Sequence, residues 1–246
     1  MGRKSKAWRI NLRVGKFRTE RRILLILIIS LVVFAGWVWL KDHPEHNPYA
    51  PLDLGHPIGW ATAQKLVSLQ DDVPTCRAVL ERSDVSFTAL PATGEGPCAL
   101  TDRTQLSAYP LSPDTPAVTC PVAAAMELWR VKTVEPAARE IFGSEIARIE
   151  HLGAFNCRRI RGNNSGAWSQ HATANAIDIA AFVLADGQRI SVLNDWDGED
   201  AKARFLREVR DGSCGVFWTV LSPDYNAAHA DHFHFDQTNR WSGVCR

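Results

Sequence analysis

The chain has 246 residues, enough for one domain of ordinary size together with a membrane anchor and a linker. Its formal net charge of +1 conceals an asymmetry: the first 22 residues hold nine Lys and Arg against one acid, whereas the rest holds 19 Lys and Arg against 26 Asp and Glu. Because the larger part is acidic, its composition argues against nucleic acid as a ligand, and we expect no nucleic-acid partner.

Residues 23–40 read ILLILIISLVVFAGWVWL, a run without a charged side chain. As a helix this run spans about 27 Å, close to the thickness of the hydrocarbon core of a bilayer. A cleaved signal peptide has a shorter apolar region followed by small residues, whereas this run ends in Trp37, Val38 and Trp39. We therefore predict an uncleaved transmembrane anchor at 23–40. The basic tail at 1–22 places the N-terminus in the cytoplasm and the rest in the periplasm, which predicts a single-pass protein of the inner membrane.

Residues 41–58 are polar and rich in Pro and His, and they show no apolar periodicity. We interpret them as an extended linker. The remaining residues, 59–246, then form the one globular domain.

The domain alternates helical and strand patterns. Apolar spacing predicts helices at 60–69, 119–143 (interrupted near Pro136) and 199–210. Alternating or short apolar runs predict strands at 86–90, 146–152, 176–184, 189–193, 216–221 and 231–235, and Asp186-Gly187 is a strong hairpin signal. The predicted fold class is α+β, with helices packed on a small, mainly antiparallel sheet.

Six cysteines lie beyond the predicted anchor: Cys76, Cys98, Cys120, Cys157, Cys214 and Cys245. An even number in an exported domain predicts three disulfides. A cysteine zinc site is the alternative, but the chain has no Cys-x-x-Cys pair to favour it. The sequence leaves the pairing open.

The residues that bear chemistry cluster between positions 169 and 236. On a strand, His232 and His234 project from the same face, and two neutral imidazoles on a stiff backbone suit a zinc ion. Asp178 falls within the apolar run AIDIAAF, where an unpaired buried carboxylate is costly and a bound metal removes that cost.

The spacing His171-x6-Asp178 followed by His232-x-His234 resembles that of the LAS metallopeptidases. This group includes lysostaphin, the D-Ala-D-Ala peptidases, a murein endopeptidase and the Hedgehog signalling domain. The resemblance implies an LAS/Hedgehog-like fold, Zn²⁺ as the cofactor, and His171, Asp178 and His234 as its ligands. It also implies that His232 lines the site.

Longer strings are similar to the bacterial extensin-like C-terminal domain family over residues 59–245. They include CPVAAAMELW at 120–129, SQHATANAIDIAAF at 169–182 and SPDYNAAHADHFHFD at 222–236. The chain lacks the Ser-Pro repeats of plant extensins, so the family name by itself implies no function.

The sequence departs from the metallopeptidase pattern at two positions. Ala174 stands where many relatives have Gly, and Asp231 stands where many have a catalytic Glu. The general base is therefore Asp231, His232 or His229, and the sequence does not choose among them. For the substrate, Arg158 and then Arg161 are candidates, because a planar guanidinium suits a carboxylate or carbonyl. An ordinary surface role is the alternative for either arginine.

These residues predict a membrane-anchored periplasmic zinc hydrolase. By analogy with the metallopeptidases, its substrate is an amide bond in the peptide stems of peptidoglycan, cleaved by metal-activated water. The alternative is a non-catalytic module that binds or scaffolds the cell wall and retains the zinc fold.

Overall fold

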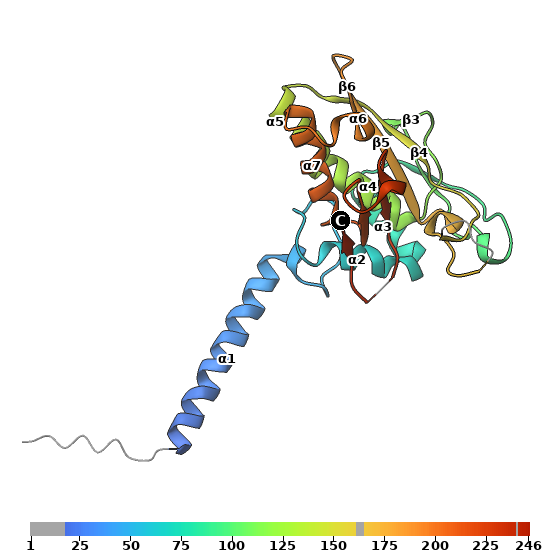
Figure 1. Cartoon of the computed structure of the whole chain (residues 1–246). Coiled ribbons are helices and arrows are strands. Elements are labelled where there is room, and N and C mark those ends of the chain that lie inside the picture. The colour runs from blue at the N-terminus through green and yellow to red at the C-terminus, as the bar shows by residue number, and fades with distance from the viewer. Residues whose placement is uncertain (1–17, 161–164, 240) are drawn as a thin grey trace, which may run out of the picture. The chain divides into compact units, whose positions relative to one another are not determined.

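The computed structural model describes residues 18–160, 165–239 and 241–246. It divides the chain into two compact units, Met1–His43 and Pro44–Arg246. The first contains α1 (Arg18–Asp42), one uninterrupted helix (Figure 1). An 18-residue window within Glu20–Asp42 has a mean hydropathy of 2.8, and this part of α1 is long and apolar enough to cross a membrane, which is consistent with a single-pass anchor.

The second unit begins with the segment expected to be a linker. Leu52 and Leu54 are buried in its core, and the carbonyl of Pro44 accepts a hydrogen bond of 2.6 Å from Nζ of Lys65. The segment thus packs onto the domain through isolated apolar side chains that lie between prolines. Because these side chains do not recur at a helical or strand spacing, the sequence pattern did not reveal their burial.

The helices predicted at 60–69, 119–143 and 199–210 are present in the second unit, the middle one as α4 (Cys120–Trp129) and α5 (Glu135–Phe142). Two helices were not predicted, at Val73–Arg82 and at Val192–Asp195, and the second begins within the strand expected at 189–193. Gly143, with φ of +63°, ends α5 in the left-handed conformation that favours glycine. A π-helical turn at Arg130–Val134 joins α4 to α5 without a break in the helical backbone, and Pro136 is the second residue of α5, directly after this turn. The helices are α2 (Thr62–Ser68), α3 (Val73–Arg82), α4 (Cys120–Trp129), α5 (Glu135–Phe142), α6 (Val192–Asp195) and α7 (Ala201–Ser213).

Two sheets complete the α+β fold. A small antiparallel sheet pairs β1 (Phe87–Ala89) with β2 (Thr104–Leu106). The larger sheet has the order β3-β4-β5-β8-β7-β9, with β6 also paired to β5. It is mixed, because β3 runs parallel to β4 and β9 parallel to β7. Its strands are β3 (Leu111–Ser112), β4 (Ile146–Gly153), β5 (Ala176–Leu184), β6 (Arg189–Ser191), β7 (Thr219–Leu221), β8 (Phe233–Asp236) and β9 (Val244–Cys245).

The core lies between the helices and one face of the larger sheet. Trp129 of α4 packs edge-on against Phe235 of β8 with ring centroids 5.2 Å apart, and Phe205 of α7 packs against Phe182 of β5 at 5.1 Å. Ile177 and Ile179 of β5 and Phe233 and Phe235 of β8 are also in this core. Because side chains alternate along a strand, Asp178 and His234, which lie between these residues, project from the opposite face. A register shift near Ala180 changes the alternation further along β5, so Phe182 also faces the core.

Three disulfides are formed, as the cysteine count predicts. They join Cys76 to Cys120, Cys98 to Cys157, and Cys214 to Cys245. The first links α3 to the start of α4, and the second fixes the chain that follows β4. The third links the end of α7 to β9.

Candidate functional site

The pairing of β5 with β8 creates the centre of the site. Asp178 lies directly across from His234 in the antiparallel register. Their neighbours Ile177, Ile179 and Phe233 are completely buried in the core. Because of the strand alternation, Asp178 and His234 project together from the face that the helices leave uncovered.

The third member, His171, lies in a 3-10 turn at Gln170–Thr173, just before β5. Oγ of Ser169 accepts a hydrogen bond from the backbone N–H of His171, which caps the turn. The N–H of Asn156 donates to the carbonyl of His171 at 2.9 Å, so the loop after β4 supports the turn from the other side. These contacts with the backbone of His171 fix the position from which its imidazole extends.

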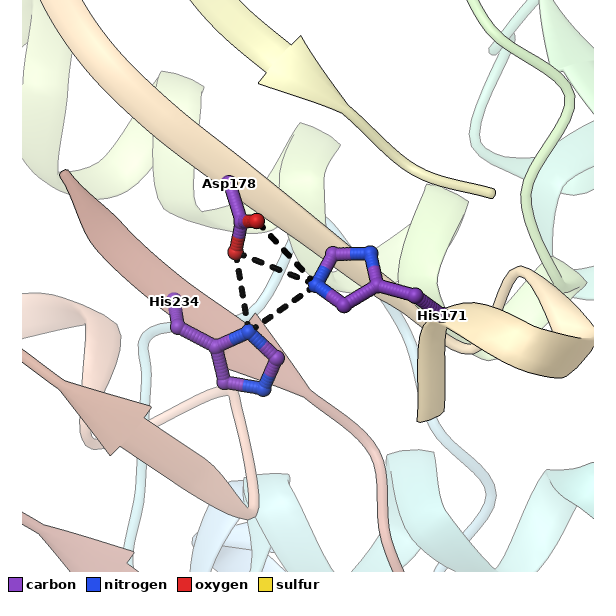
Figure 2. Close-up of side chains that lie close together, drawn as sticks. All are labelled: His171, Asp178 and His234. Carbon is purple, nitrogen blue, oxygen red and sulfur yellow. Dashed lines mark hydrogen bonds and ion pairs between the residues drawn. The ribbon is translucent and has the colours of Figure 1, made fainter. Parts of the chain in front are cut away.

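The functional atoms of the three side chains converge (Figure 2). Nε2 of His171 lies 3.1 Å from Nδ1 of His234 and 3.2 Å from Oδ1 of Asp178. Nδ1 of His234 lies 2.8 Å from the same carboxylate oxygen. Adjacent ligand atoms in a tetrahedral zinc site with bonds of about 2.0–2.1 Å are about 3.3 Å apart, so these spacings are close to those of such a site.

The hydrogen bonds on the outer sides of the rings define which nitrogens face inward. Nδ1 of His171 donates to the carbonyl of Ala154 at 3.0 Å, and Nε2 of His234 donates to Oδ2 of Asp236 at 3.0 Å. A neutral imidazole with one nitrogen protonated offers a lone pair on the other. The inward-facing atoms are therefore two nitrogen lone pairs and a carboxylate, a donor set that a divalent cation satisfies.

The electrostatics of the cluster favour a positive charge at its centre. Burial opposes the ionisation of Asp178, but hydrogen bonds from His171 and His234 outweigh burial and hold the pKa of Asp178 well below its ordinary value. Burial likewise opposes a charge on His234, but its bonds to Asp178 and Asp236 raise the pKa of His234 to about 9. A cation is thus the species that this site favours electrostatically.

Two further histidines face the three-residue cluster. His232 precedes β8 rather than lying within it, and its Nε2 is 3.7 Å from Oδ1 of Asp178. Its Nδ1 donates to Oδ1 of Asp231 at 2.7 Å, and Asp231 itself is exposed. The ring centroids of His229 and His232 are 5.2 Å apart. Burial, then the neighbouring His232 and His234, lower the pKa of His229 to about 4.

All four histidines line one cleft of about 410 Å³. Arg158 lies on its rim, next to Cys157 of the second disulfide, and among the described residues none forms an ion pair with its guanidinium. The other predicted arginine, Arg161, lies outside the residues that the structure describes.

Other residues that line the cleft were not predicted from the sequence. Gln170, Tyr225 and Asn226 also line the cleft, and the side-chain oxygen of Asn226 accepts a hydrogen bond of 2.9 Å from Nδ1 of His229. Asn226 additionally caps the 3-10 turn Ala227–His229. An Asn directly before Ala-Ala-His is a capping signal, and that signal predicts the support of His229.

A comparison with protein families finds one match. The family model described as "Extensin-like protein C-terminus" covers residues 74–246, which include every site residue discussed above. Neither the curated proteins nor the solved structures include a significant match to the chain.

Proposed function

Because the chain belongs to the extensin-like protein C-terminus family and brings His171, Asp178 and His234 together in a cleft, we propose that it is a zinc hydrolase. The observation that supports this most directly is the convergence of two imidazole lone pairs and one carboxylate at spacings close to a tetrahedral edge. The proposed reaction is hydrolysis of an amide bond in the peptide part of a cell wall.

The three side chains line the cleft and would hold Zn²⁺ there. A bound zinc ion would supply a water of lowered pKa and polarise a substrate carbonyl. The protein contributes the fixed ligand geometry and a cleft that is open to a peptide.

His232 is the proposed proton carrier. Its bond to Asp231 fixes the ring so that Nε2 faces the cleft near Asp178. An imidazole in that position can accept a proton from the attacking water and pass it to the leaving amine. In this assignment Asp231 orients His232 and does not itself contact the reacting atoms. His229, held by Asn226, is the second candidate for the base.

Arg158 is the proposed substrate contact. Its guanidinium lies at the cleft rim with no described acidic partner, so it is available to a carbonyl or carboxylate oxygen of a peptide. The disulfide at the preceding residue restricts the motion of the backbone that bears it. A cation held near developing negative charge stabilises a tetrahedral transition state.

The proposed location follows from α1. With the basic tail in the cytoplasm, α1 would anchor the protein in the inner membrane and the domain would lie in the periplasm. Three disulfides suit that oxidising compartment. Peptidoglycan peptide stems are then within reach.

A second candidate function is a wall-binding or scaffolding module that keeps zinc without catalysis. The side chain of Asp231 favours it, because this carboxylate is paired with His232 and is 53% exposed. Asp231 is not among the residues that line the cleft, so a mechanism that requires an acidic general base at this position would not operate here.

The first experiment is a measurement of zinc content in the full chain, purified in mild detergent with its disulfides intact. The wild type should hold about one zinc per chain, and His171→Ala and His234→Ala should lose it. His151→Ala is the matched control, since His151 is buried but binds the carbonyl of Asp114 instead of the cluster. Cleavage of cross-linked muropeptides by the wild type, read by mass spectrometry, would separate the hydrolase from the binding module. A folded wild type without zinc would overturn the proposal.

A further inference from the structure

We infer that Asn175 is the positioning residue of the three-ligand cluster, because hydrogen bonds from its buried side chain and from its backbone join the segments that bear all three side chains. The inference rests on the proposed zinc site. Asn175 is only 4% exposed, yet it offers a donor and an acceptor on its side chain and another of each on its backbone. Each of these four groups is hydrogen-bonded.

Two of the four bonds hold the turn that bears His171. The backbone N–H of Asn175 donates to the carbonyl of Gln170 at 2.9 Å, and its Nδ2 donates to Oε1 of Gln170 at 2.7 Å. Gln170 directly precedes His171, so this pair of bonds closes the turn at the residue next to the ligand. Ala174, with φ of +53°, makes the tight reversal that brings Asn175 back to Gln170.

A third bond reaches the strand that bears His234. The N–H of Gln237 donates to the carbonyl of Asn175 at 3.3 Å. Gln237 directly follows Asp236, the residue that accepts the proton of Nε2 of His234. Asn175 also directly precedes β5, on which Asp178 is the third residue. One residue therefore fixes the spacing of both strands and the turn.

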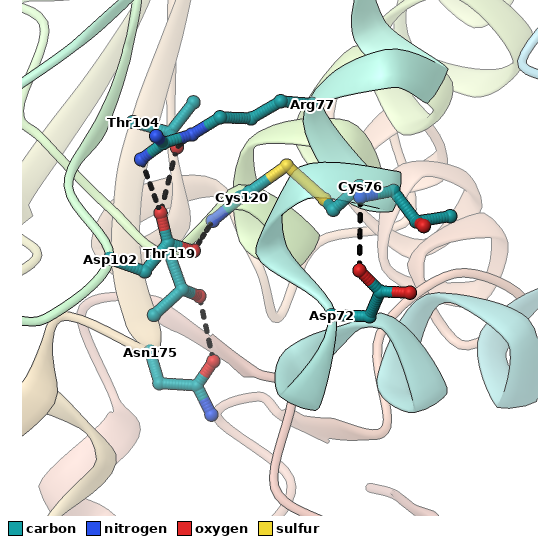
Figure 3. The surroundings of a disulfide bond; sticks show 9 residues. Asp72, Cys76, Arg77, Asp102, Thr104, Thr119, Cys120 and Asn175 are labelled. Carbon is teal, nitrogen blue, oxygen red and sulfur yellow. Dashed lines mark hydrogen bonds and ion pairs between the residues drawn. A yellow bond between two sulfur atoms is a disulfide. The ribbon is translucent and has the colours of Figure 1, made fainter.

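The fourth bond connects Asn175 to a rigid support (Figure 3). Oγ1 of Thr119 donates to Oδ1 of Asn175 at 2.8 Å, and the N–H of Thr119 donates to the carbonyl of Ala174 at 3.0 Å. Thr119 precedes α4, whose first residue, Cys120, is bound to Cys76 in a disulfide and donates its N–H to the Asp102 carboxylate. The segments that bear the three candidate ligands are thus attached, through Asn175 and Thr119, to the start of a helix that a disulfide holds in place.

An asparagine suits this position because its side chain must accept from Thr119 and donate to Gln170. Asp can accept but cannot donate from its carboxylate, and Ala can do neither. A buried polar partner left without its bond destabilises the local arrangement, so the turn would relax away from the ligand geometry. Partners that orient metal ligands typically change metal affinity by about 10–100-fold when they are removed.

The test uses the full chain in detergent and compares Asn175→Ala, Thr119→Val and Thr119→Ser. Ser213→Ala is the control, because it removes an equally buried hydroxyl bond, to the carbonyl of Arg210, from α7. Zinc affinity is measured by chelator competition. The ¹⁵N shifts of the His171 and His234 rings, recorded for the metal-free protein above about pH 9 where His234 is neutral, report their tautomers. We expect Asn175→Ala to weaken zinc binding about 10–100-fold and to mix the tautomers. Thr119→Val should have a smaller effect in the same direction, whereas Thr119→Ser and Ser213→Ala should resemble the wild type.

The two readouts separate this inference from the proposed function. If the wild type binds zinc and Asn175→Ala binds it equally well, the positioning role is wrong and the zinc site stands. If the wild type binds no zinc but Asn175→Ala still mixes the ring tautomers, the zinc hydrolase is wrong and the positioning role stands. If neither zinc binding nor tautomers depend on Asn175, the inference is overturned.

Discussion

Nε2 of His171 and Nδ1 of His234 face each other at 3.1 Å, so the two rings present different nitrogens to the same point. The difference follows from their outer hydrogen bonds. A backbone carbonyl fixes the proton of His171 on Nδ1, and a carboxylate fixes the proton of His234 on Nε2. Two lone pairs so close together repel each other unless a cation or a proton lies between them. The outer bonds are therefore as important to the site as the inward-facing atoms.

Removal of the Asp236 carboxylate should weaken zinc binding without removing a ligand. Asp236→Ala leaves Nε2 of His234 without its acceptor, so the ring loses its fixed tautomer and orientation. We expect the zinc affinity of Asp236→Ala to be about 10–100-fold lower than that of the wild type. The zinc affinity of Asp236→Asn should fall less, because its amide oxygen can still accept the hydrogen bond from His234. Thr238→Val is the control, since it removes only the contact from the Thr238 hydroxyl to Asp236. Equal affinity in Asp236→Ala and the wild type would show that His234 needs no such support.

Zinc affinity should rise with pH. The pKa of His234 is about 9 in the metal-free site, so at pH 7 its inward nitrogen carries a proton that zinc must displace. Because the protonated form is the one that the metal-free fold favours, the apparent association constant should increase about tenfold per pH unit between about pH 6 and 8. It should level off above about pH 9, where His234 is already neutral. Asp178 stays ionised across this pH range because its pKa is lowered, so it does not contribute to the pH dependence of zinc affinity.

Chelator competition across this pH range measures that slope. Calorimetry in two buffers of different ionisation enthalpy should independently give about one proton released per zinc. A binding constant that does not change with pH would mean that His234 is neutral in the metal-free protein.

The sequence predicts much of the framework because strong periodic patterns lie where the core is simple. The run at 176–184 forms β5 over the predicted residues, and the Asp186-Gly187 signal is the β5–β6 turn, with Gly187 at φ of +89°. The helix pattern at 199–210 becomes α7, with Asp200 as its cap. Local patterns sufficed here because burial and propensity favour the same structure.

Long-range contacts are what the sequence could not give. It could not choose the disulfide pairs, and it contained no signal for the parallel strands β3 and β9, whose partners lie far along the chain. The strand expected at 231–235 begins two residues later, because His232 turns to pair with Asp231 before the ladder starts. At the site, histidine and aspartate spacing marked the three converging side chains. The supports from Asn175 and Ala154 are backbone and amide contacts that have no motif.

The choice among the three candidate bases can be made by comparing single variants at constant zinc content. His232→Ala should lower the rate of muropeptide cleavage about 10²–10⁴-fold, the usual contribution of a positioned acid–base group. Asp231→Asn should cost less, because the ring of His232 keeps a hydrogen-bond partner. His229→Ala should also cost less, since His229 forms no ion pair with Asp178 among the described residues, whereas Nε2 of His232 lies 3.7 Å from its Oδ1. A larger loss in His229→Ala than in His232→Ala would reverse this assignment.

Two of the disulfides should stabilise the fold about equally and differ in their effect on the site. The bonds Cys98–Cys157 and Cys214–Cys245 close segments with sequence separations of 59 and 31 residues. In the chain-entropy description, each removal should lower the free energy of unfolding by about 4 kcal/mol, since the dependence on loop length is logarithmic. Paired Cys→Ser variants, unfolded in urea in mild detergent, would measure both losses.

Only the first of these disulfides adjoins the loop that supports His171. That loop supplies the Ala154 carbonyl to Nδ1 of His171 and the Asn156 N–H to its backbone, and it bears Arg158 at the cleft rim. Under conditions where both variants remain folded, loss of Cys98–Cys157 should weaken zinc binding and raise the KM for a muropeptide. Loss of Cys214–Cys245 should leave zinc binding unchanged, because β9 and the end of α7, which it releases, bear none of the three ligands. Equal effects of the two removals on zinc affinity would indicate that general stability, and not the loop after β4, governs the site.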